Sequence, residues 1–143
     1  MKRNSRRLVL VLFGLYLLCL VLLLFQRRIQ SEHSFNLLPF QTIRAYFLVL
    51  GREDAAGLAL RPYAVTNFVG NLLAFLPMGY FLPKLFRAQR RFWLFLFTVT
   101  LFICLVELLQ LVTRRGALDV DDLLLNLPGA CLGWLLWKST KRI

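Results

Sequence analysis

The residues whose types could do chemistry gather between Glu107 and Asn126, in the stretch ELLQLVTRRGALDVDDLLLN. One glutamate, two arginines, three aspartates and two amides stand here between two apolar runs. Polar side chains this close to lipid are costly unless they are paired or solvated. Carboxylates, guanidinium groups and amides can together move protons, hold a divalent cation or bind phosphate and hydroxyl groups. We therefore expect the functional site in this segment.

Three segments place polar residues at helical spacing, so that each set shares one face of its helix. We expect these three faces to meet at one membrane depth and to line a cavity that opens outward. The sets are Asn67 with Asn71; Glu107 with Gln110 and Arg114; and Asp119 with Asp122 and Asn126. With Arg115 added beside Arg114, these residues are the candidate ligand-binding residues.

Three carboxylates of this group are the catalytic candidates: Glu107, Asp119 and Asp122. Glu107 lies about four residues, or ~6 Å, inside the membrane end of its helix. It could form a general acid/base pair with one of the aspartates, or the carboxylates could hold a divalent cation. The sequence contains no nucleophile–base pair of a familiar type, so whether the protein is an enzyme stays open.

No metal site and no organic cofactor is expected. The three cysteines, Cys19, Cys104 and Cys131, lie far apart in apolar runs, without CxxC spacing, and are interpreted as small buried hydrophobic residues. His33 is the only histidine and follows the first apolar run. A divalent cation held by the carboxylates is the one cofactor left open.

Each polar group also has a structural alternative. The aspartates 119, 121 and 122 could cap a helix N-terminus, where a carboxylate contributes roughly 0.3–1 kcal/mol. Asn67 and Asn71 could form hydrogen bonds between helices, worth about 0.6 kcal/mol in membranes. Arg114 and Arg115 could extend from a helix end to the membrane interface.

The composition is typical of a membrane protein. Of 143 residues, 59% are hydrophobic and only 17% are charged, more apolar surface than a soluble domain could cover. Four apolar runs, at about 8–26, 63–86, 92–112 and 118–137, approach the ~20 residues that a membrane helix needs. The sequence therefore predicts an all-α integral membrane four-helix bundle, with 1–143 as a single domain.

The connections have their own expected structure. Gln41–Leu50 is too short to span a membrane and suits an interfacial or re-entrant segment between the first two helices. Gly51–Gly57 is interpreted as a turn. Pro77 should free the carbonyl of Leu73 and kink the second helix, and Gly129 with Gly133 should allow close helix packing inside the bundle.

The basic residues predict the orientation. With both termini in the cytoplasm, eleven of the 18 basic residues and none of the seven acidic ones fall on the cytoplasmic side. The formal net charge of +11 then reports topology and contact with anionic lipid, and nucleic acid is not an expected partner. These basic residues are Lys2, Arg3, Arg6, Arg7, Lys84, Arg87, Arg90, Arg91, Lys138, Lys141 and Arg142.

Three ordered blocks resemble the VanZ-like family of bacterial membrane proteins: NLLPF at 36–40, NFVGNLLAFLPMGYFLP at 67–83, and the stretch 107–133 with ExxQ, DVDDLLLN and spaced glycines. The family usually has a threonine after the asparagine that Asn126 matches, whereas Leu127 follows here. The family residues that carry over are Asn71, Pro77, Gly79, Glu107, Gln110, Asp119, Asp122, Asn126 and Gly129.

The resemblance implies a multi-pass protein of the bacterial cytoplasmic (inner) membrane associated with resistance to the lipoglycopeptide teicoplanin. Its expected partners are membrane lipids and a lipid-linked envelope molecule or the lipoglycopeptide itself, which the outward cavity would bind or alter. One alternative is an intramembrane enzyme acting on a lipid-linked phosphate or a glycolipid headgroup. A second is an oligomeric transporter or channel subunit. The sequence leaves the oligomeric state and the native ligand open.

Overall fold

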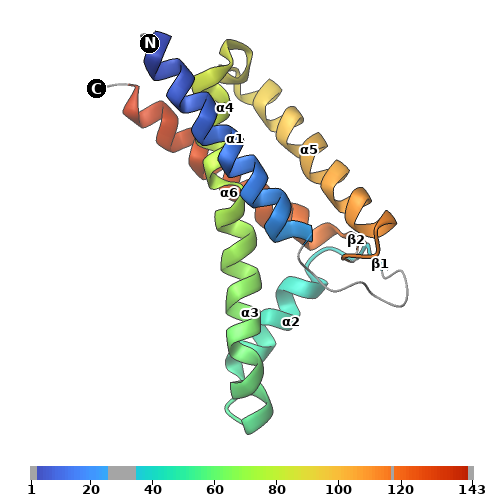
Figure 1. The fold of residues 1–143 in the computed structure, drawn as a ribbon. Helices are drawn as coiled ribbons and strands as arrows, with labels where there is room; N and C mark the ends of the chain where they lie inside the picture. Colours follow the sequence, from blue (N-terminus) through green and yellow to red (C-terminus); the bar gives the residue numbers. More distant parts are fainter. Residues whose placement is uncertain (1–2, 26–34, 117, 142–143) are drawn as a thin grey trace.

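The computed structural model describes residues 3–25, 35–116 and 118–141. In this part the regular secondary structure is helical apart from one parallel pair of two-residue strands (Figure 1). The predicted all-α class is confirmed, and the short strand pair was not foreseen. The elements are α1 (Arg3–Phe25), β1 (Phe35–Asn36), α2 (Gln41–Gly51), α3 (Ala55–Ala74), α4 (Leu76–Leu85), the 3-10 helix η1 (Arg87–Arg90), α5 (Phe92–Val112), β2 (Leu118–Asp119) and α6 (Val120–Thr140).

Among the described residues, three helical segments are long and apolar enough to cross a membrane: Asn4–Leu23, Ala55–Leu85 and Phe92–Val112. The third coincides with its expected span, and the first two overlap theirs but begin earlier; residue 26 of the first expected span lies outside the described residues. The expected fourth span, at 118–137, is not among these three; its first two residues form β2, and the helix α6 begins at Val120 and ends at Thr140. Asp121, Asp122 and Asn126 make the first half of α6 more polar, and the helix packs against α3, α4 and α5.

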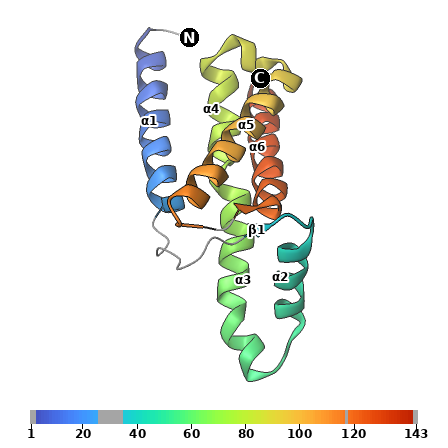
Figure 2. The same cartoon turned by 90° about the vertical axis from the view of Figure 1, so that its right-hand side faces the viewer.

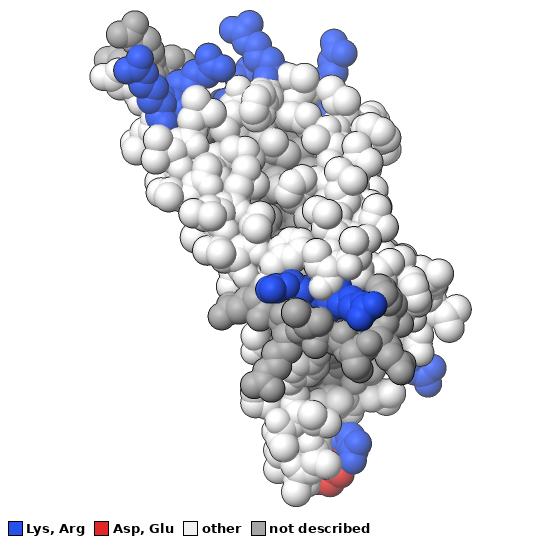
Figure 3. Space-filling model, turned by 45° about the vertical axis from the view of Figure 1, so that its right-hand side comes forward, with Lys and Arg blue, Asp and Glu red and all other residues white. Residues whose placement is uncertain are grey.

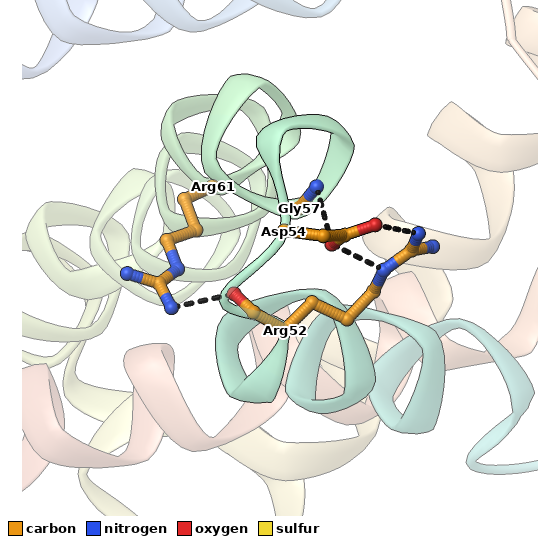
Figure 4. A network of polar contacts seen from close by, with 4 residues as sticks. All are labelled: Arg52, Asp54, Gly57 and Arg61. Atoms are coloured by element: carbon orange, nitrogen blue, oxygen red, sulfur yellow. Dashed lines mark hydrogen bonds and ion pairs between the residues drawn. The ribbon is translucent and has the colours of Figure 1, made fainter.

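The second helix begins earlier than predicted, at Ala55 rather than at residue 63. Only residues 52–54 separate α2 from α3, so the expected turn at Gly51–Gly57 is shorter than predicted. The cause is an N-cap: Oδ1 of Asp54 accepts a hydrogen bond from the backbone N–H of Gly57 at 3.1 Å (Figure 4). Pro62, where the sequence placed the boundary, lies inside the helix at an exposed position.

Arg52 and Arg61 complete this turn (Figure 4). The Arg52 guanidinium donates to Asp54 through Nε at 2.9 Å and Nη2 at 2.5 Å. These bonds, with a smaller contribution from the Gly57 N–H, hold the pKa of Asp54 below its ordinary value. Arg61 donates to the Arg52 carbonyl at 2.6 Å, so three charged side chains fix the connection between α2 and α3.

The predicted kink at Pro77 is confirmed as an interruption at Phe75, which ends α3 and precedes α4. Pro77 has no N–H to donate to the carbonyl of Leu73. That carbonyl instead accepts a hydrogen bond from the N–H of Phe75, which tightens the turn and separates the two helices.

The helix α6 packs against α3 and α4 at backbone distance because glycines line the contact. A Cβ atom added at Gly129 would lie 1.8 Å from the carbonyl oxygen of Leu72, and one at Gly133 would lie 2.0 Å from that of Leu76. The predicted internal packing of these two glycines is therefore confirmed. Next to this contact lies the apolar core, formed by Leu20, Phe75, Met78, Phe95, Val99, Ile103, Ala130, Trp134 and Trp137.

The two ends of the molecule differ. The start of α1, the end of α6 and η1 lie at one end, where Lys and Arg side chains project in Figure 3, and we call it the basic end. At the opposite end α2 and α3 form a hairpin that extends beyond the other helices (Figure 2). The segment Gln41–Leu50, expected to be interfacial or re-entrant, forms α2, which packs on α3 through Phe47 and Phe68, with ring centroids 5.7 Å apart.

Candidate functional site

The strand β2 holds Asp119 at the junction of three segments. The pairing of β1 with β2 sets Asn36 opposite Asp119, and the Asn36 amide donates to Oδ1 of Asp119 at 2.9 Å. Thr42 donates its hydroxyl hydrogen to Oδ2 at 2.6 Å. Oδ1 also accepts the backbone N–H of Asp121 at 2.8 Å, so Asp119 is the N-cap of α6. The capping alternative is therefore confirmed for Asp119.

Asp121 caps a different helix from the one that carries it. Its fully buried carboxylate accepts the backbone N–H groups of Phe40 at 2.6 Å, Thr42 at 2.7 Å and Ile43 at 3.0 Å. These N–H groups belong to the N-terminus of α2, which has no partner for them within the helix. Asp121 was not among the ligand-binding candidates. The sequence feature that could have identified Asp121 is its position beside Asp122, on a neighbouring face of the same helix.

The predicted polar faces of α3 and α6 do meet. The amide of Asn71 donates to Oδ1 of Asp122, and both side chains are buried. Asn126, one turn further along α6, is only 3% exposed, and its Oδ1 has no hydrogen-bond partner among the described residues. A buried oxygen left in this state costs about 1–3 kcal/mol unless a water or ligand donor reaches it.

The polar face of α5 joins the same group. Glu107 is 6% and Gln110 2% exposed, in a helix that is otherwise almost entirely apolar. Oε2 of Glu107 accepts the backbone N–H of Asp119 at 3.3 Å. We call six residues of these helices the polar cluster, in which Asn71 contacts Asp122, Glu107 contacts Asp119, and Gln110 and Asn126 are buried on the same helices: Asn71, Glu107, Gln110, Asp119, Asp122 and Asn126.

A pocket of about 180 Å³ lies beside the polar cluster and is open to the surface. Glu107 and Asp119 are its two titratable side chains apart from one cysteine, and the remaining walls are aliphatic. We call it the Glu107 pocket. It is lined by Leu37, Cys104, Glu107, Leu118, Asp119, Val120 and Leu123.

The two arginines of the candidate set occupy other places. Arg114 follows α5 with a left-handed backbone (φ 57°), and the N–H of Arg115 returns to the carbonyl of Gln110 at 2.9 Å, so the pair ends the helix in a Schellman motif. The Arg114 side chain is exposed. The Arg115 guanidinium donates to the carbonyl of Phe25 at 2.5 Å and thereby closes the end of α1.

Asn67, the remaining candidate, is partly buried on α3, and its amide donates to the Tyr63 carbonyl of the same helix at 2.8 Å. It lies one turn from Asn71, further into the protruding hairpin. Of the nine ligand-binding candidates, four thus form the pairs Asn71–Asp122 and Glu107–Asp119, and Gln110 and Asn126 are buried on the same helices. Asn67, Arg114 and Arg115 make other contacts.

The carboxylates and cysteines do not assemble a metal centre in the part of the chain that the structure describes: no group of three His, Cys, Asp or Glu side chains is suitably placed. His33 lies outside the described residues. Cys19 and Cys104 are exposed, so their interpretation as buried residues is wrong, and Cys131 is partly buried. In a membrane protein, apolar residues lie on the outward faces of helices as well as in the core. Hydropathy alone therefore does not show whether a small apolar residue such as cysteine is buried.

Comparison with known proteins gives the family. Searches of curated proteins and of solved structures found no match. The family model described as VanZ/LLP1 matches residues 11–141. The matched range holds all the polar-cluster residues and, with its apolar helices, is consistent with a membrane protein. Because the match covers nearly the whole sequence, the chain belongs to the VanZ-like family.

Proposed function

We propose that this protein is a four-helix, multi-pass protein of the bacterial cytoplasmic membrane, with α1, α3–α4, α5 and α6 as its spans. Both ends of the chain lie in the cytoplasm and the polar cluster lies near the outer surface. The charge distribution supports this orientation, because η1 and the helix ends at the basic end carry arginines and lysines, whereas the described acidic residues belong to the opposite half.

The Glu107 pocket binds one end of an amphiphilic, lipid-linked molecule of the cell envelope. The observation that carries this proposal is the pairing of two carboxylates with aliphatic walls in one open pocket. Carboxylates accept hydrogen bonds from hydroxyl, amide or ammonium groups, and the leucines cover a hydrocarbon segment. At about 180 Å³ the pocket is smaller than the roughly 300–1,000 Å³ that encloses a whole small molecule, so most of the ligand stays outside it.

Glu107 has the central role in this site. It lies in the pocket wall and also touches the N–H of Asp119, so it joins α5 to the start of α6 where the ligand binds. Asp119, on the same pocket wall, accepts hydrogen bonds from Asn36, Thr42 and the backbone N–H of Asp121, and these bonds fix its orientation. The consequence for the cell is lower susceptibility to teicoplanin, the phenotype that the family resemblance suggests.

The first test compares teicoplanin susceptibility of cells that express wild type, Glu107→Gln or Glu53→Gln at matched membrane levels. Glu53→Gln removes an exposed carboxylate from the hairpin tip and serves as the control. We expect protection by wild type and by Glu53→Gln, and loss of protection with Glu107→Gln. Equal protection by all three would reject Glu107 as a functional residue. If none protects, the family phenotype does not extend to this chain.

A second test separates binding from catalysis. Purified protein in lipid nanodiscs is incubated with a radiolabelled lipid-linked disaccharide-peptide, with and without magnesium. Retention of unchanged label by wild type, reduced in Glu107→Gln, is the expected result. Conversion of the label by wild type but not by Glu107→Gln would instead favour the intramembrane enzyme, with magnesium dependence indicating a bound divalent cation.

A further inference from the structure

Two neighbouring pockets at the basic end are lined by cations. The first, of about 430 Å³, combines Arg90, Lys138 and Lys141 with Trp134 and Trp137, and we call it the tryptophan pocket. The second, of about 570 Å³, is called the Arg6 pocket; its basic lining residues are Arg6, Lys84, Arg87 and Arg90. Arg90 lines both, so it stands between the two.

The tryptophan pocket has a rigid aromatic floor. Trp134 and Trp137 are 6% and 8% exposed, and the indole N–H of Trp134 donates to the Gln89 carbonyl at 3.1 Å. The ammonium group of Lys138 lies 5.2 Å from the Trp134 ring centroid, and that of Lys141 lies 5.6 Å from the Trp137 centroid. These cation–π contacts hold the cations over the floor before any ligand arrives.

Arg90 is fixed between the two pockets. Its Nε donates to the Pro83 carbonyl at 3.2 Å, and its guanidinium carbon lies 5.9 Å from the Trp137 ring centroid. Its terminal nitrogens donate no hydrogen bond to the residues that the structure describes, so they can make a bidentate contact with an anion, the geometry in which arginine binds phosphate most strongly.

The pockets lack negative charge. None of their six basic side chains forms an ion pair with a carboxylate in the part of the chain that the structure describes. Several cations gathered in two adjoining pockets repel one another, and an anion bound among them relieves this repulsion. The positive-inside rule explains cations at this end, but it does not require pockets, a shared arginine or a tryptophan floor.

We propose that the two pockets bind the headgroup of an anionic phospholipid with two phosphates, one in each pocket, with Arg90 contacting both. Basic pockets between helices at the cytoplasmic surface suit such headgroups, and tryptophan is common at this depth of a membrane. Phe86, 47% exposed in the lining of the Arg6 pocket, offers an apolar surface for an acyl chain. This site is independent of the Glu107 pocket.

The test uses the fluorescence of the pocket itself. Trp93, the third tryptophan, is 79% exposed, so Trp93→Phe leaves only Trp134 and Trp137 as reporters. The full chain with this change, in phosphatidylcholine nanodiscs, is titrated with cardiolipin, with phosphatidylglycerol at equal total charge, and with inorganic diphosphate. We expect cardiolipin to change the emission at a concentration about tenfold lower than phosphatidylglycerol, and diphosphate to have little effect.

Two variants decide whether the effect is specific. Arg90→Gln should remove the preference for cardiolipin, and Arg91→Gln should keep it, because Arg91 is an exposed neighbour that lines neither pocket. Lys138 is exposed and forms no hydrogen bond with another described residue, so Lys138→Gln should weaken binding while the Arg90 bond to Pro83 is kept. If Arg90→Gln and Arg91→Gln lose the preference for cardiolipin equally, the lipid is attracted by the general positive charge and not by a specific site. Diphosphate binding as tight as cardiolipin would overturn the lipid assignment.

Discussion

Oδ2 of Asp121 lies 2.7 Å from the backbone nitrogen of Thr42, although the two residues are 79 positions apart. This contact sets a carboxylate at the N-terminus of α2, where the helix dipole and the unpaired N–H groups favour negative charge. It also holds Phe40, whose N–H donates to Oδ1 at 2.6 Å, in a left-handed conformation (φ 67°) that a residue with a side chain rarely adopts. Asp121 thus fixes the segment that supplies Leu37 to the Glu107 pocket.

Asp121→Asn should release α2. An amide has a single acceptor oxygen, so at least one of the three N–H bonds is lost and the others lose their charge assistance, a destabilisation of about 2–3 kcal/mol. Hydrogen exchange of detergent-solubilised protein should show faster exchange at Thr42 and Ile43. Glu53→Gln, which removes an exposed carboxylate on the same hairpin, should leave both amides protected. Unchanged exchange in Asp121→Asn would contradict the capping role.

Gly133→Val should separate α6 from α4. Its Cβ would lie 2.0 Å from the carbonyl oxygen of Leu76, so the helices must move apart at a cost of about 3 kcal/mol. Thermal unfolding monitored by circular dichroism measures the loss. Gly14→Ala is the matched control, since a Cβ there meets nothing within 4 Å. Equal melting temperatures for the two variants would show that close α4–α6 packing contributes nothing.

Asn71→Ala should weaken the α3–α6 contact. It removes a buried interhelical hydrogen bond to Asp122, worth about 1 kcal/mol. Asn67→Ala is the comparison, since the bond from the Asn67 amide to the Tyr63 carbonyl lies within α3 and does not reach α6. Unfolding in a graded denaturing detergent compares the two variants. A larger loss for Asn67→Ala would mean that the hairpin, rather than the polar cluster, holds α3 in place.

The start of α3 should fray in acid. Because the Arg52 hydrogen bonds lower the pKa of Asp54 in the folded chain, this cap contributes fully above the ordinary carboxyl pKa and is lost as the pH falls through the lower folded-state value. Amide exchange of Gly57, corrected for the intrinsic rate, should accelerate over that acidic range. Arg52→Gln should move the midpoint of this change upward. A midpoint that does not respond to Arg52 would exclude the ion pair as the cause.

Hydropathy and proline chemistry predicted most of the helical framework. The runs ending near Phe25 and Val112 are long and uninterrupted, so their helices follow from length alone. Pro77 gave the position of the break in the second helix, because the missing N–H acts on a carbonyl at a fixed distance along the chain. The start of α3 was missed because it depends on the side chain of Asp54, and a cap can extend a helix past a proline such as Pro62.

Part of the polar cluster could be predicted from the sequence, because helical spacing places residues on one face of a helix. Asn71, Asp122 and Asn126 lie where that spacing and the antiparallel arrangement require. Contacts between segments that are distant in the sequence could not be predicted from it. The bonds of Asp121 to residues 40–43 depend on how the segment before α2 folds back, and the bond of Arg115 to Phe25 depends on where α1 ends. No periodicity within a single helix carries that information.

The interruption at Phe75 affects how the protein meets bilayers of different thickness. A continuous helix from Ala55 to Leu85 has 31 residues and would be about 46 Å long, well beyond a hydrocarbon core of about 30 Å. In a straight helix, such an excess is accommodated by tilting the whole segment. Here the joint at Phe75 divides the length between two shorter helices, and α6 packs on both sides of it, against Leu72 of α3 and Leu76 of α4. We therefore expect a change in membrane thickness to be taken up by the first turns of α3, which extend beyond the contact with α6.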